Sequence, residues 1–128
     1  MDNSINLTAA EWKLMEGLWE RSPLTGRELT EQMQAQCGWS RSTTLTLLSR
    51  MEAKGAVSGD SSAGKKVFSP LISRENAALQ EAENFLDRVY KGSLGMMVSS
   101  LTRKQSLSRE EIDELYAILR EMEAKDDA

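Results

Sequence analysis

The sequence predicts a mainly α-helical protein with one small β-hairpin and a C-terminal helical extension. Two observations lead to this fold class. Most of the chain carries apolar residues at helical spacing, in segments that open with helix-capping residues. Residues 56–69 instead form short β-prone runs around a Gly-, Ser- and Asp-rich tip. The 128 residues, 40% of them hydrophobic, suffice for one core of about 70 residues with an appendage.

The helix starts share a capping device. A Thr or Ser is followed three residues later by Glu at Thr8 with Glu11, Thr25 with Glu28, and Ser108 with Glu111. Ser40 and Ser73 are simpler N-cap candidates. With the apolar spacing, these starts predict helices at about 9–21, at 26–36, from Ser40 to Gly55, from Ser73 onward, and at 109–124.

The order of these elements indicates a winged helix-turn-helix. Only Cys37–Trp39 separates the second and third helices, and a hairpin of 56–58 with 66–69 follows them. We therefore expect a winged-helix domain at 1–71 and a helical dimerisation domain at 72–128. Gly92 and Gly95 predict a kink or break in the second part, because glycine disfavours helix interiors.

The composition excludes most catalytic and metal chemistry. The chain has no histidine and a single cysteine, Cys37, so the commonest general base and metal ligand are missing and no internal disulfide can form. We expect no enzyme activity, no catalytic residues, no metal and no cofactor. Cys37 is expected to be a small buried residue at the helix turn, with a redox sensor as the alternative.

No segment of the sequence predicts membrane insertion or secretion. There is no run of about 18 apolar residues, and the N-terminus lacks the charged-then-apolar pattern of a signal peptide. We expect a cytoplasmic protein.

The third helix predicts contact with double-stranded DNA. Its apolar spacing directs Thr44, Leu47, Leu48 and Met51 to one side and leaves the short side chains of Ser42, Thr46, Ser49 and Ala53 on the other. Short side chains let a helix approach base edges in the major groove. The net charge is −4, but residues 39–71 carry five basic against two acidic residues, which suits a local phosphate-binding surface.

Eight residues are the candidates for DNA contact. We expect base contacts from Ser42, Leu45 and Thr46, and phosphate contacts from Arg41, Arg50, Lys54, Lys65 and Lys66. Leu45 would contact a thymine methyl group, or would alternatively pack into the core of its own domain. Lys65 and Lys66 follow Gly64 at the hairpin tip, where a wing would reach the DNA backbone; an ordinary solvated turn is the alternative.

The C-terminal helices predict a homodimer, because amphipathic helices rich in Leu, Met and Phe cannot bury their apolar faces alone. The expected interface residues are Phe85, Leu86, Val89, Leu101, Ile112, Leu115 and Leu119. Packing of these faces on the winged helix of the same chain is the alternative.

Residues 39–55, Trp-Ser-Arg-Ser-Thr-Thr-Leu-Thr-Leu-Leu-Ser-Arg-Met-Glu-Ala-Lys-Gly, closely resemble the recognition-helix signature of the BlaI/MecI/CopY family of bacterial repressors. Residues 7–12, 85–93 and 107–115 resemble further family motifs in the same order. The resemblance implies a homodimer whose two winged helices bind a palindromic operator and block transcription, and, in the antibiotic-responsive branch, control of antibiotic resistance.

In that branch, the resemblance further implies that a membrane-bound sensor protease leads to cleavage in the dimerisation region. The aligned position is Ser100–Leu101, where those relatives have Asn followed by Phe. Both residues differ here, which puts the same protease specificity in question. The paired cysteines of the copper-responsive branch are absent, so the resemblance does not extend to metal sensing.

Two other functions remain open from the sequence. A winged helix can serve as a protein-interaction module without binding DNA, although the small polar residues on the third helix argue against this. A small-molecule-sensing repressor would share the DNA-binding half but would need an apolar ligand pocket.

Overall fold

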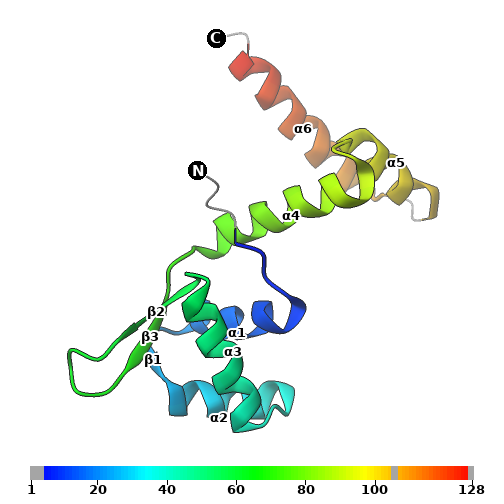
Figure 1. Ribbon diagram of the computed structural model, residues 1–128. Helices are drawn as coiled ribbons and strands as arrows, with labels where there is room; N and C mark the ends of the chain where they lie inside the picture. Colours follow the sequence, from blue (N-terminus) through cyan, green and yellow to red (C-terminus); the bar gives the residue numbers. More distant parts are fainter. Residues whose placement is uncertain (1–4, 105–106, 127–128) are drawn as a thin grey trace. The chain divides into compact units, whose positions relative to one another are not determined.

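The computed structural model describes residues 5–104 and 107–126. Residues 1–4, on which the expected lack of a signal peptide depended, lie outside them. The chain forms two compact units, Met1–Asn84 and Phe85–Ala128. The described residues are mostly helical with one small antiparallel sheet (Figure 1), so the predicted fold class is confirmed.

The first unit contains the winged helix. Its elements are α1 (Ala9–Glu20), β1 (Leu24–Thr25), α2 (Gly26–Cys37), α3 (Arg41–Ala53), β2 (Val57–Asp60) and β3 (Val67–Pro70). The strands pair in the antiparallel order β1-β3-β2, which places Phe68 opposite both Leu24 and Gly59. Strand β1 was not expected from the sequence, because two residues give no alternating pattern and its partner β3 is far away in the chain.

The predicted caps form. Thr8 and Thr25 each make a complete capping box with the Glu three residues later. Ser40 Oγ accepts a hydrogen bond from the Thr43 amide and starts α3. Gly38 ends α2 with a φ of 70°, a left-handed conformation that favours glycine. The turn between α2 and α3 is therefore fixed at both ends by local chemistry.

The core lies between α1, α2, α3 and the sheet. Its fully buried side chains include Leu14, Leu18, Leu29 and Met33, and the apolar side of α3 packs against them. Cys37 is partly buried and packs against this core.

Helix α4 (Arg74–Tyr90) is tied to the winged helix at its start. The indole of Trp19 donates to the carbonyl of Ile72 at 2.9 Å, and Arg74 pairs with Glu16 at 3.1 Å. The first unit, which ends at Asn84, therefore includes most of α4 as well as the winged helix.

The second unit contains the end of α4, α5 (Leu94–Lys104) and α6 (Arg109–Asp126). The break after α4 falls at Lys91 and Gly92, whose φ angles are 52° and 83°. The predicted break is therefore confirmed at Gly92, and Gly95 lies within the first turn of α5. No helix in the described ranges is long and apolar enough to span a membrane.

Candidate nucleic-acid interface

Helix α3 has one buried and one exposed side, as its spacing predicted. Thr44, Leu47, Leu48 and Met51 are buried. The opposite side exposes four small, uncharged side chains, those of Ser42, Thr46, Ser49 and Ala53. This exposed strip has the short side chains that a helix needs to lie close to base edges.

Two arginines flank the strip. Arg41 lies in the first turn of α3 and Arg50 in the last, and both are exposed. Neither forms an ion pair with any residue that the structure describes. Their guanidinium groups are therefore available to phosphate oxygens, for which the planar donor fork is well suited. Leu45 is only partly exposed and packs against the core, which favours the core-packing alternative for this residue.

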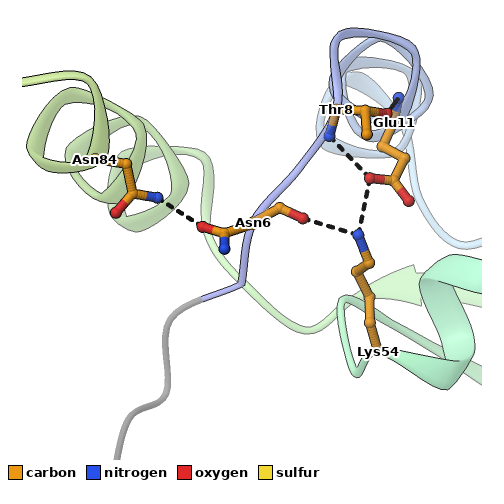
Figure 2. Close-up of polar contacts among 5 residues, drawn as sticks. All are labelled: Asn6, Thr8, Glu11, Lys54 and Asn84. Carbon is orange, nitrogen blue, oxygen red and sulfur yellow. Dashed lines mark hydrogen bonds and ion pairs between the residues drawn. The ribbon is translucent and has the colours of Figure 1, made fainter. Parts of the chain in front are cut away.

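Lys54, at the C-terminal end of α3, has partners inside the protein (Figure 2). Its Nζ lies 2.9 Å from Glu11 Oε1 and donates to the Asn6 carbonyl at 2.8 Å. The Lys54 side chain is 30% exposed and that of Glu11 is fully buried. Lys54 thus neutralises a buried carboxylate, and this arrangement competes with the predicted phosphate contact.

The electrostatic balance at Glu11 depends on these contacts. Burial by itself would raise the pKa of Glu11, but hydrogen bonds from Lys54 and Thr8 and the charge of Lys54 outweigh it and lower the pKa below its ordinary value of 4.5. Glu11 Oε2 has no hydrogen-bond partner among the described residues. The contacts with Lys54 and Thr8 together therefore keep Glu11 ionised at neutral pH.

In the wing, the two predicted lysines differ in their contacts. Lys66 Nζ pairs with Glu52 of α3 at 3.1 Å and lies 5.3 Å from the centre of the Phe68 ring. Lys65 is exposed and has no ion-pair partner in the part of the chain that the structure describes. Of the two, Lys65 has the ammonium group that is available to a phosphate.

Gly59 makes room for the contact between wing and helix. A Cβ at this position would meet the end of the Lys66 side chain and would lie 2.7 Å from Glu52 Oε2. The missing side chain on β2 thus lets Lys66 of the wing reach Glu52. Sequence reasoning missed the ion pairs of Glu11 and Glu52, because their partners lie 43 and 14 residues away in the chain.

The second unit exposes a large apolar surface. Five of the seven predicted interface residues are exposed, with Ile112 and Leu86 partly buried. The exposed five are Phe85, Val89, Leu101, Leu115 and Leu119. Further large apolar side chains, absent from the predicted interface, are exposed in the same unit: Leu94, Met96, Tyr116, Ile118 and Met122. Ser100 and Leu101, the aligned cleavage position, are exposed within α5.

Within residues 5–104 and 107–126, no three His, Cys, Asp or Glu side chains gather where they could hold a metal ion.

The helix-turn-helix, the exposed strip of α3 and the lysine-bearing wing define a winged-helix DNA-binding protein.

Comparison with known proteins identifies the family. The model of the penicillinase repressor family matches residues 7–121. The methicillin resistance regulatory protein MecI of Staphylococcus aureus is 32% identical over 122 residues, covering 93% of this chain and 98% of that protein. The penicillinase repressor of Bacillus licheniformis is also 32% identical, over 115 residues and 90% of each chain. This chain therefore belongs to the penicillinase repressor family, whose members are transcriptional repressors and not enzymes.

Solved structures agree with this assignment over the winged helix. The solution structure of the DNA-binding domain of the repressor BlaI matches with a TM-score of 0.53 and 25% identity, over 59% of this chain and 93% of that one. The same values hold for the monomeric form of Bacillus licheniformis BlaI in complex with the blaP half-operator. The structural match thus covers nearly all of a solved DNA-binding domain and 59% of this chain.

Proposed function

We propose that this chain acts in the bacterial cytoplasm as a homodimer that binds a palindromic operator and blocks transcription. The exposed strip of α3, flanked by Arg41 and Arg50, which form no ion pair with a described residue, is the observation that carries the proposal. A dimer places two such helices in successive major grooves, so the symmetry of the protein matches that of its operator. The half-operator complex of a relative, Bacillus licheniformis BlaI, supports the use of this fold on DNA.

The contacts follow from exposure and charge. Ser42 and Thr46 face the base edges, while Arg41, Arg50 and Lys65 bind phosphates. Lys54 and Lys66 stabilise the fold next to this interface and do not bind phosphates, because each is already paired with a glutamate. The phosphate contacts position α3, and the hydroxyl groups read the sequence.

The proposal is tested by selecting duplexes from a random-sequence library with the full chain, and by footprinting on DNA upstream of the chain's own gene. A palindromic consensus is expected. Arg50→Ala should then weaken binding to every duplex and lower the slope of log affinity against log salt by about one unit. Lys13→Ala, which removes an exposed lysine from α1, is the matched control and should leave the slope unchanged. Failure to enrich any sequence would leave the protein-interaction module as the better proposal.

Dimerisation is proposed to use the apolar surface of the second unit. Leu115 and Leu119 are 39% and 49% exposed on α6, and burial of such side chains by a second copy would remove them from water. Leu119→Glu should shift the protein toward monomer in sedimentation velocity, whereas Glu123→Gln, at an exposed polar position of the same helix, should not. Identical sedimentation of the Leu119 variant and the unaltered chain would reject this interface.

Release from the operator is proposed to follow cleavage between Ser100 and Leu101 by a sensor-linked protease. Both residues are exposed, and α5 has 11 residues, a length at which a helix is marginal on its own and can open locally. Cleavage would separate α6 from the rest of the dimerisation surface. Cells carrying the native locus should show a shortened repressor by immunoblot and mass spectrometry after addition of a β-lactam. Induction with the repressor still full length would reject cleavage.

A further inference from the structure

Asn6 lies between the recognition helix and α4 and contacts both (Figure 2). Its backbone carbonyl accepts a hydrogen bond from Lys54 Nζ at 2.8 Å, at the C-terminal end of α3. Its side-chain Oδ1 accepts a hydrogen bond from Asn84 Nδ2 at 2.7 Å, on α4. One residue thus joins the helix that faces DNA to the helix that leaves the winged-helix unit.

Both ends of this link are held by further contacts. On one side, Lys54 is fixed by the fully buried Glu11, which also accepts the Thr8 amide at 2.8 Å. On the other side, Asn84 Oδ1 accepts a hydrogen bond from Gln80 Nε2 at 3.0 Å. The Asn84 amide therefore uses its oxygen within α4 and its nitrogen on Asn6, which sets its orientation.

The hydrogen bond between Asn6 and Asn84 holds α4 at a point far from the start of that helix. The other contacts of this segment with the winged helix come earlier in the chain, at Ile72 just before α4, at Arg74 in its first turn and at the buried Ala77. Glu81 of α4 also lines a pocket with Trp12 and Lys13 of α1. Asn84 lies two turns further along, about 10 Å from Ala77 at 1.5 Å per residue. Contacts at one end of a helix leave it free to pivot, whereas a second contact at a distance fixes its direction.

We propose that Asn6 and Asn84 are positioning residues that set the operator spacing accepted by the dimer. The inference rests on the proposed function, in which α4 continues into the unit that pairs with a second copy. Fixing α4 against the end of α3 then limits the separations that the two recognition helices can adopt. A dimer with this link should prefer one half-site spacing, and a dimer without it should tolerate several.

The test compares duplexes recovered by selection from a random library with versions whose half-sites are one or two base pairs closer or further apart. Affinity is measured by fluorescence anisotropy with the full chain. Asn84→Ala should reduce the preference for the selected spacing by about two- to tenfold, the range that the loss of one net hydrogen bond allows. Asn6→Ala should do the same, because it removes the side-chain link and leaves the carbonyl that binds Lys54.

The double variant provides the sharpest readout. Since both residues serve one hydrogen bond, Asn6→Ala with Asn84→Ala should reduce the spacing preference no further than either change alone. Asn76→Ala, at an exposed asparagine of the same helix, is the matched control and should keep the full preference. Affinity for an isolated half-site should be unchanged in all variants, because the DNA-contacting side of α3 is intact.

The outcomes separate this inference from the proposed function. If the unaltered chain does not bind a half-site, or does not form a dimer, the proposed function itself is overturned. A dimer that binds the operator and whose spacing preference is the same in Asn84→Ala and in the unaltered chain would overturn the positioning role alone. Additive effects of the two substitutions would also overturn it.

Discussion

Replacing Lys54 by methionine tests how the buried charge of Glu11 is tolerated. The change keeps most of the aliphatic side chain and removes the ammonium 2.9 Å from Glu11 Oε1. Glu11 would then be a fully buried carboxylate with Oε2 unpartnered and only the Thr8 amide bonded to Oε1. Breaking one side of a buried ion pair costs about 3–5 kcal/mol.

Protonation of Glu11 limits the part of this cost that comes from the unpaired charge. Taking up a proton at pH 7 by a group with an ordinary pKa of 4.5 costs about 3.4 kcal/mol, at 1.36 kcal/mol per pH unit. We therefore expect Lys54→Met to lower the free energy of unfolding by about 3 kcal/mol at pH 7. Urea unfolding at one fixed protein concentration, followed by tryptophan fluorescence, measures this loss. Lys13→Met removes an exposed lysine from α1 and should change stability by less than about 0.5 kcal/mol.

The loss should depend on pH in a defined direction. In the unaltered chain the pKa of Glu11 is lowered on folding, so its stabilising contribution is present above about pH 4.5 and disappears as the pH falls through the lowered value. In Lys54→Met, burial dominates and raises the pKa, so folding favours the protonated form. The difference between the two proteins should therefore shrink between pH 7 and pH 4.

A second substitution separates charge from packing. Adding Glu11→Gln to Lys54→Met removes the buried charge, and this double variant should regain most of the lost stability at pH 7. A loss below about 1 kcal/mol for Lys54→Met, or a loss that is the same at pH 7 and pH 4, would refute the reasoning that Glu11 depends on Lys54.

Three further predictions concern DNA binding and assembly. Lys65→Ala should lower the slope of log affinity against log salt for operator binding by about one unit. Lys66→Ala should leave that slope nearly unchanged, since Lys66 is paired with Glu52. Equal slopes for the two variants would contradict this difference. Thr46→Ala should change the base preference at one position of each half-site, by about 1–3 kcal/mol, when the selection is repeated; an unchanged consensus would remove Thr46 from base contact. A fragment ending at Asn84 should fold, sediment as a monomer and bind the full operator about a hundredfold more weakly, and a dimeric fragment would place the dimer contacts in the first unit.

The charge distribution explains how an acidic chain can present a DNA-binding surface. The net charge is −4, but Arg41, Arg50 and Lys65 are exposed on α3 and the wing without ion-pair partners among the described residues. Phosphate binding depends on the local arrangement of cations within a screening length of about 8–10 Å, so distant carboxylates weaken it little.

The sequence alone determined the features that depend on neighbouring residues. The capping boxes at Thr8 and Thr25 set the starts of α1 and α2, and apolar spacing separated the buried side of α3 from its exposed strip. These signals are local, because a cap acts over three residues and a helical face repeats every three or four. For this reason the order of the main elements and the exposed residues Ser42 and Thr46 could be predicted without a structure.

Only the tertiary structure decided which of the charged side chains it describes form ion pairs. Lys54, Lys65 and Lys66 are equivalent in the sequence as basic residues near a predicted DNA surface, yet Lys54 is 43 residues from its partner Glu11 and Lys66 is 14 residues from Glu52. No periodicity or local spacing encodes such pairs, because they form only when α3 packs against α1 and the wing folds back on α3. The same holds for Asn6 and Asn84, 78 residues apart, which meet because the packing of the winged helix brings Asn6 against α4.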